Sequence, residues 1–260
     1  MSAAGTRLEF EEYIALGDSL SLDLYPALDA GQTDVAVALE RVERAGETAP
    51  LGAASLLFRN AEEQWPDDAG EDLISRYAGL AFTNLATDDA SIGDVFGEQL
   101  DQVPRSDRAT LFTLTVGSND LFSAFTHRGT AAMLEAIVRD VAEAYGHLVR
   151  AIQQVRPRSL LVLSTIPDPS DRTGRVDGVF EGGRYSLGAL DRLNAAIREL
   201  AGHTPGTVLA DVYLHFLGHG ASVEEKERWF WRRSPLEPNA VGASEMRKVW
   251  LEAVRGAAGE

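Results

Sequence analysis

The sequence of 260 residues has no cysteine and has few basic residues for its number of acidic ones. Without a thiol, the chain can form neither a disulfide nor a thiolate metal site. It has 24 Lys and Arg residues against 40 Asp and Glu residues, which gives a formal net charge of -16. Because the acidic residues are spread along the chain, nucleic acids and anionic membranes are poor partners on electrostatic grounds.

Long apolar runs are also missing from the sequence. No stretch reaches the roughly 20 apolar residues that a membrane-spanning helix needs. The segment 1–10 lacks an apolar core as long as that of a signal peptide. We therefore expect a cytoplasmic protein without a membrane span, and its oligomeric state stays open.

Short apolar runs alternate with helical patterns along the chain. Apolar residues recur at three- and four-residue steps in 134–152 and 187–200, and a further helix is expected from Ala240. This alternation predicts an α/β fold with a parallel sheet and right-handed crossovers. Five apolar runs are typical of its strands: 13–16, 80–86, 110–116, 159–163 and 207–212.

The length and the 45% content of hydrophobic residues are enough for one domain over residues 1–260. The pattern changes between residues 31 and 79, where a helix over 35–42 is followed by glycine- and proline-rich turns. We expect this segment to be an insertion on the carboxyl-end side of the sheet, where it could form a wall of a pocket.

The first apolar run ends abruptly in Gly-Asp-Ser-Leu, residues 17–20. Such a turn places a small nucleophilic side chain at the carboxyl end of a strand, which is where open α/β sheets bind their ligands. Ser19 is therefore the candidate nucleophile. The third run ends in Gly-Ser-Asn-Asp, residues 117–120, which brings Asn119 to the same edge of the sheet.

These two segments resemble signature blocks of the SGNH hydrolases, also called the GDSL family, and the resemblance covers nearly the whole chain. It implies a flavodoxin-like three-layer α/β/α sandwich with a five-stranded parallel sheet. In the family, a serine attacks an ester or thioester carbonyl. The oxyanion is held by the serine N–H, a glycine N–H and an asparagine side chain, and each such donor lowers the barrier by about 3 to 4 kcal/mol. The resemblance thus implies Ser19 as nucleophile, with its N–H and Asn119 as oxyanion donors.

Two other family blocks are altered. Residues 84–90 match the block Asn-x-x-x-x-Gly-Ala, with Asp89 in the place of the glycine. The Asp89 N–H can still bind the oxyanion, but its carboxylate would oppose that charge unless it turns away or a cation lies near. Residues 234–239 match Asp-x-x-His-Pro-Asn, with Glu237 in place of the histidine base and Ser234 in place of its aspartate partner.

Three residues are candidates for the missing base. His219 lies between two glycines beyond the fifth apolar run, in a Phe-x-Gly-His segment that resembles loops of SGNH relatives, and His215 is close to it in sequence. Glu237 could orient His219 or act itself, although a carboxyl group with an ordinary pKa of about 4.3 is a feeble base for a serine hydroxyl. Since triads are defined by geometry and not by chain order, the predicted catalytic residues are Ser19, His219 and Glu237.

The function that the resemblance implies is hydrolysis of a small-molecule ester of a small or medium acyl group through a Ser19 acyl-enzyme. The alternative is a catalytically inactive binding protein with the SGNH fold, because Asp89 and Glu237 replace the usual glycine and histidine. No cofactor is expected.

Several acidic residues could crowd the rim of the site and either hold a cation or favour a cationic substrate: Asp18, Asp23, Asp88, Asp89, Asp120 and Glu237. Their spacing matches no known metal-ligand pattern, so no metal is expected and a solvated acidic face is the simpler interpretation. Arg228, Arg232 and Arg233, which alternate with tryptophans before Glu237, could instead neutralise these carboxylates or bind an anionic acyl or leaving group.

Overall fold

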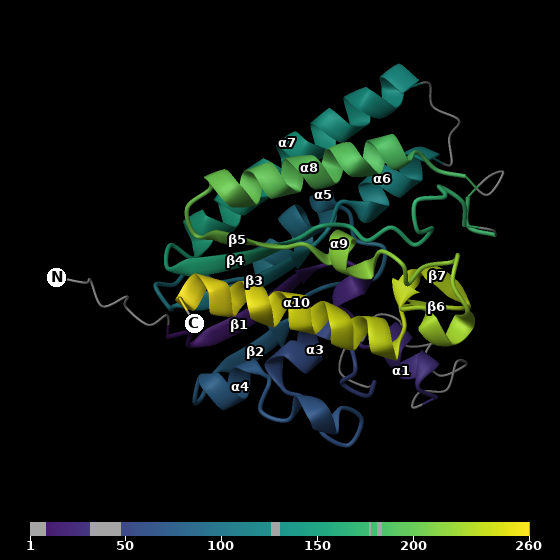
Figure 1. Cartoon of the computed structure of the whole chain (residues 1–260). Helices are drawn as coiled ribbons and strands as arrows, with labels where there is room; N and C mark the ends of the chain where they lie inside the picture. Colours follow the sequence, from purple (N-terminus) through teal and green to yellow (C-terminus); the bar gives the residue numbers. More distant parts are fainter. Residues whose placement is uncertain (1–8, 32–47, 126–130, 177, 181–183, 260) are drawn as a thin grey trace.

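The computed structural model describes residues 9–31, 48–125, 131–176, 178–180 and 184–259 (Figure 1). The helix expected over 35–42 lies outside the described residues. Five parallel strands form a central sheet in the order β2-β1-β3-β4-β5. This is the flavodoxin-like order, so the predicted fold class is confirmed. The strands are β1 (Glu12–Gly17), β2 (Ala81–Asn84), β3 (Thr110–Thr115), β4 (Ser159–Ser164) and β5 (Thr207–Ala210).

Helices cover both faces of this sheet (Figure 1). The helices α5 (Ile92–Asp94), α7 (Ala131–Val155) and α8 (Leu187–His203) lie on one face, and α3 (Ala53–Phe58) and α10 (Ala240–Ala258) on the other. The remaining α-helices of the described residues are α1 (Leu24–Asp29), α4 (Leu73–Arg76), α6 (Ser118–Phe125) and α9 (Val212–Phe216).

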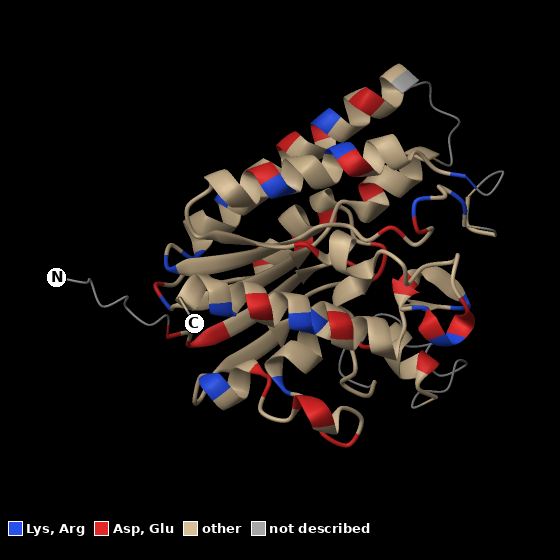
Figure 2. Cartoon of the chain, in the orientation of Figure 1, with Lys and Arg blue, Asp and Glu red and all other residues tan. Residues whose placement is uncertain are grey.

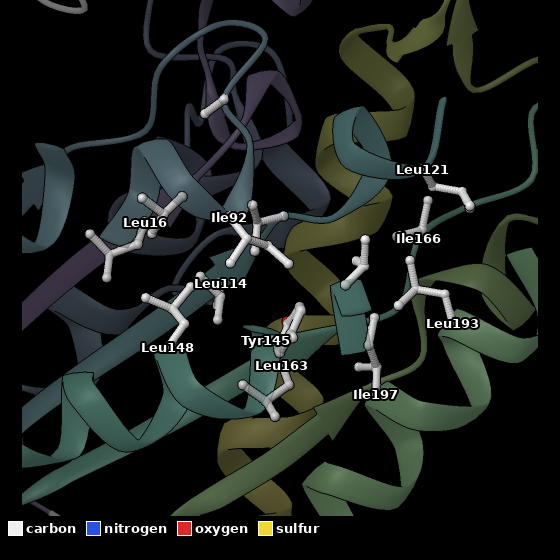
Figure 3. Close-up of a cluster of buried hydrophobic side chains, with 14 of the residues drawn as sticks. Leu16, Ile92, Leu114, Leu121, Tyr145, Leu148, Leu163, Ile166, Leu193 and Ile197 are labelled. Carbon is white, nitrogen blue, oxygen red and sulfur yellow. The ribbon is translucent and has the colours of Figure 1, made fainter. Parts of the chain in front are cut away.

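Alternate residues of the strands supply two hydrophobic cores, because successive side chains of a strand point to opposite faces. Leu16, Leu114 and Leu163 face α7 and α8, where they pack with Tyr145 and Ile197 (Figure 3). The opposite faces of the same strands pack against α3 and α10, with Trp250 fully buried among them. Burying each such large apolar side chain stabilises the fold by about 1.5 to 3 kcal/mol.

Residues 48–79 are the described part of the expected insertion. Ala53, Ala54 and Leu57 of α3 are fully buried in the core that contains α10. This helix therefore packs onto the sheet, on the face that α10 also covers.

A short antiparallel ribbon, β6 (Phe230–Trp231) and β7 (Ser234–Pro238), comes directly before α10. The sequence analysis did not predict it, because two short strands that contain two prolines carry no periodic signal. The ribbon packs on α1 and places Glu237 on a strand. As predicted, α10 begins at Ala240, where Asn239 caps it by accepting a hydrogen bond from the Gly242 N–H at 2.8 Å.

Acidic side chains are spread over helices and loops throughout the chain (Figure 2). Basic side chains are interspersed with them, for example along α10. Among the described residues, no helix combines the length and the apolar character that crossing a membrane requires.

Candidate active site

The turn after β1 is held in a tight contact with β3. Gly17 has a φ of 132°, and a Cβ atom there would overlap the carbonyl oxygen of Thr115. The Gln99 side chain forms two hydrogen bonds with the backbone of Gly17. Its Oε1 accepts from the Gly17 N–H and its Nε2 donates to the Gly17 carbonyl, both at 2.8 Å. These contacts present Ser19 at the carboxyl end of β1, at the start of a 3-10 helix over Ser19–Ser21.

Asp18 joins this turn to the turn after β3. The carboxyl group is fully buried and accepts from the Leu20 N–H at 3.2 Å and from the Ser118 hydroxyl at 2.6 Å. Burial raises the pKa of Asp18 to about 6, although these hydrogen bonds oppose the rise. Two segments that lie 100 residues apart in sequence are thus locked together beside Ser19.

The turn after β3 is joined in the same way to the loop that precedes α5. The Asn119 Nδ2 donates to the Ala90 carbonyl at 3.0 Å, and the Asp120 carboxylate accepts from the Ile92 N–H at 3.0 Å. Asp89 in this loop has a φ of 55°, a left-handed conformation that favours glycine. Asp tolerates it better than most residues do, which explains how a carboxylate can occupy the place of the family's glycine.

A small cavity of about 50 Å³ lies at Ser19. A wider groove of about 590 Å³ shares some of its walls and continues between α6 and α7. The residues that line both are Asp89, Asn119, Phe122 and Leu236. Aromatic and aliphatic side chains form most of the far wall of the groove, including Val141, Val179 and Phe180. The two cavities together suit a small polar reacting group with an apolar extension.

Glu237 lies in the lining of the Ser19 cavity, and its side chain is 9% exposed. Burial raises the pKa of its carboxyl group to about 8; contact with the Ser19 hydroxyl lowers it, and the charges of Asp18, Asp88 and Asp89 raise it further. Within the described part of the chain, its buried Oε2 atom has no hydrogen-bond partner. A carboxyl group at the position of the family's base thus has a pKa in the range that general base catalysis requires.

Tyr25 and Asp88 form a hydrogen-bonded pair near Glu237. The Tyr25 hydroxyl donates to both carboxylate oxygens of Asp88, at 3.0 and 2.9 Å, and the Tyr25 ring lies 5.8 Å from that of Trp231. Burial raises the pKa of Asp88, as does the neighbouring charge of Asp89, while contacts with Tyr25 and with the Asp89 N–H lower it. Tyr25 was not among the predicted site residues, and no local sequence pattern marks it.

The structure places both candidate histidines outside the lining of the Ser19 cavity. The His219 ring stacks on Trp229 at 3.6 Å, and its Nδ1 lies 2.8 Å from the Glu227 carbonyl oxygen. The His215 Nε2 lies 2.9 Å from a carboxylate oxygen of Glu245. The structure therefore brings Ser19, Asp89, Asn119 and Glu237 together in the lining of one cavity. His215 and His219 contact other residues instead.

Arg228 and Arg232, two of the three arginines before Glu237, have other partners as well, and Arg233 is exposed. The Arg228 guanidinium donates to the Val223 and Ala221 carbonyls at 2.8 and 3.2 Å, and Arg232 pairs with Glu225 at 3.5 Å. With Arg175 they line a separate cavity of about 330 Å³. As far as the chain is described, neither the Ser19 cavity nor the groove is lined by a lysine, arginine or histidine. Nor do the described residues include a group of three His, Asp or Glu that could hold a metal ion.

Comparison with known proteins identifies relatives of this architecture. The model of the GDSL-like lipase/acylhydrolase family matches residues 15–244. Phospholipase A1 from Streptomyces albidoflavus NA297 is 21% identical with a TM-score of 0.61, over 95% of this chain and 99% of that one. The extracellular lipase from Streptomyces rimosus is 20% identical with a TM-score of 0.57, over 95% and 99% of the two chains. A lipase from a goat rumen metagenome is 16% identical with a TM-score of 0.56, over 95% and 97%. No curated protein sequence matches the chain.

Proposed function

Because the chain belongs to the GDSL-like lipase/acylhydrolase family, we propose that it is a serine esterase in which Ser19 attacks an ester of a small or medium acyl group. One observation carries this proposal: Ser19, Asn119 and Glu237 line a single cavity at the carboxyl edge of the sheet. The adjoining apolar groove offers room for the acyl chain.

In this proposal Glu237 is the base. The Ser19 Oγ forms a bond to the carbonyl carbon while its proton passes to the Glu237 carboxylate. The tetrahedral intermediate then expels the alcohol, which takes up that proton, and the acyl group stays on Ser19. A water molecule then attacks the acyl carbon while Glu237 takes one of its protons. The bond to the Ser19 Oγ breaks, the acid is released, and the proton on Glu237 returns to the Ser19 Oγ. Contact of the Glu237 carboxyl group with the Ser19 hydroxyl favours Glu237 over His219 for this role.

The oxyanion donors are the Ser19 N–H and the Asn119 side chain. One hydrogen of the Asn119 Nδ2 is used for the Ala90 carbonyl, and the amide has a second one for the oxyanion. The Asp89 N–H is the third donor proposed, and to serve it must turn from its contact with the Asp88 carboxylate.

The competing function is binding without catalysis. It is favoured by the raised pKa of Glu237, because a carboxyl group with a pKa of about 8 is mostly protonated at neutral pH and then cannot accept a proton. An active enzyme with this base should show a kcat/KM for neutral esters that rises with pH until it levels off above about 8.

The test combines hydrolysis of short-chain nitrophenyl esters with fluorophosphonate labelling. We expect Ser19→Ala to lose about a thousandfold or more in kcat/KM and all labelling. Ser244→Ala is the matched control, because Ser244 is fully buried in α10 and its hydroxyl has no partner among the described residues. Full activity of Ser19→Ala would refute the esterase, and an unlabelled, inert wild type would favour the binding protein.

The same assay decides between the candidate bases. Glu237→Gln keeps the shape of the side chain but cannot accept a proton, so it should be nearly inactive, while His219→Ala should retain most activity. The reverse result would assign the base to His219.

A further inference from the structure

We propose that the Ser19 pocket is built for esters that carry an ammonium group, which would lie beside the carboxyl groups of Asp89 and Glu237 in the lining of that pocket. This inference rests on the proposed esterase function and adds the class of substrate. The pocket has an unusual charge for an esterase. The reaction creates an oxyanion, yet the groups around it are acidic.

The groups that face Glu237 come from several elements. Asp18 approaches from the turn after β1, and Asp88 and Asp89 from the loop after β2. From α1, Tyr25 adds a hydroxyl that already donates to Asp88. In the lining of the groove, Asp120 adds another carboxyl group, whose partner is the Ile92 N–H.

Among the described residues that line the two cavities there is no basic side chain that could pair with these carboxyl groups. Two nearby arginines bind other groups, Arg228 main-chain carbonyls and Arg232 the Glu225 carboxylate, and Arg233 is exposed and lines neither cavity. A charge of opposite sign must therefore come from the ligand, if the carboxylates are to be neutralised during the reaction.

A second observation points to a ligand independently of this charge. The Oε2 atom of Glu237 is buried in the pocket lining and has no hydrogen-bond partner within the described part of the chain. Leaving such an atom unsatisfied costs free energy, so it is an acceptor that a bound group can fill. An ammonium group supplies both a positive charge and, when it carries hydrogens, a donor.

An aromatic ring, that of Phe122, also lies in the lining of both cavities. Aromatic faces attract ammonium groups, particularly methylated ones that cannot form hydrogen bonds. The lining of the Ser19 cavity thus combines the carboxyl groups of Asp89 and Glu237 with an aromatic side chain.

The proposal has a mechanistic consequence for Glu237. A positive charge beside its carboxyl group favours the ionised form, so a cationic substrate would produce the base that its own hydrolysis needs. The same charge would offset the repulsion between the carboxylates and the oxyanion. A cationic ester should therefore be hydrolysed at a lower pH than a neutral ester of the same shape.

The first experiment compares butyrylthiocholine with S-(3,3-dimethylbutyl) thiobutyrate, in which carbon replaces the ammonium nitrogen. For the wild type at pH 7, we expect kcat/KM to be about tenfold or more higher for the cationic ester. Asp89→Asn should reduce this ratio about threefold or more; because both esters are measured on the same variant, a change in rate common to both cancels in the ratio. The control Asp101→Asn, at an exposed position outside the two cavities, should leave the ratio unchanged.

The second experiment needs no turnover: tetramethylammonium chloride is titrated calorimetrically into the wild type and both variants. We expect binding that Asp89→Asn weakens and Asp101→Asn does not. Equal rates on the two esters overturn the proposal and leave the esterase standing. If neither ester is hydrolysed, binding that depends on Asp89 upholds the cation site and counts against the esterase, whereas its absence overturns the cation site.

Discussion

At the scale of single residues, the altered positions of the site are explained by their surroundings. Asp89 occupies the glycine's place with a φ of 55°, which Asp can adopt more readily than a β-branched or bulky residue. Glu237 occupies the histidine's place, and its burial moves its pKa from the ordinary range of a carboxyl group to about 8. The Glu237 carboxyl group can thus gain or lose a proton near neutral pH, as a histidine does.

The pKa of Glu237 also predicts how stability depends on pH. The folded-state pKa of about 8 lies above the ordinary value of 4.5, so between these values the folded state binds more protons than the unfolded state. The free energy of unfolding contributed by this group therefore falls as the pH rises from about 4.5 to about 8.

Glu237→Gln removes this titration. We expect the variant to be more stable than the wild type at pH 8.5 and the advantage to shrink at pH 5, as measured by urea denaturation at about these two pH values. A difference that is constant with pH would contradict the raised pKa. Glu252→Gln, on an exposed part of α10, should show no such trend.

At the scale of elements, the turn after β1 depends on a residue from a different part of the chain. Gln99 lies in a π-helical turn over Val95–Gln99 and is 1% exposed. Its side chain satisfies both the N–H and the carbonyl of Gly17, and its Nε2 also lies 3.1 Å from the Thr87 hydroxyl. The amide thus joins the turn that carries Ser19 to the loop that carries Asp89.

We expect Gln99→Leu to lower the free energy of unfolding by about 1 to 3 kcal/mol, because the buried Gly17 N–H is left without a partner while the Gly17 carbonyl keeps the Thr87 N–H at 3.1 Å. It should also lower kcat more than it raises KM, since the Ser19 turn loses its support. Denaturation and steady-state kinetics measure the two effects. Gln102→Leu, in the next helical turn and exposed, is the control; equal behaviour of the two variants would show that Gln99 is not a support.

At the scale of the whole molecule, the formal net charge of -16 opposes the compact state by self-repulsion. Ion pairs formed by buried arginines with partly exposed carboxylates offset part of it, for example Arg247 with Asp68 at 2.6 Å and Arg156 with Glu12 at 3.1 Å. The acidic residues are spread along the helices and loops of the chain (Figure 2), and salt screens the repulsion between exposed charges.

We therefore expect the melting temperature to rise when sodium chloride is increased from about 0.01 to about 0.3 M, a range over which the screening length falls from about 30 Å to less than 8 Å. Thermal unfolding followed by circular dichroism at pH 7.5 measures the shift. A melting temperature that stays constant or falls would mean that attractive ion pairs outweigh the net repulsion.

Much of this protein follows from patterns that are local in the sequence. Apolar runs and three- to four-residue periodicity predict the five strands and the long helices, because these patterns reflect which face of each element is buried. A strand that ends in a short glycine turn is recognisable without any distant partner, so Ser19 and Asn119 could be placed at one edge of the sheet from sequence.

The identity of the proposed base and its pKa depend instead on distant packing. His219 lies beside glycines in the sequence, yet the folded chain stacks it on Trp229. Glu237 is an ordinary carboxylate until the ribbon β6–β7 buries it beside Ser19 and near Asp18, Asp88 and Asp89. Burial and the sum of neighbouring charges set a pKa, and both come from segments that meet only after folding.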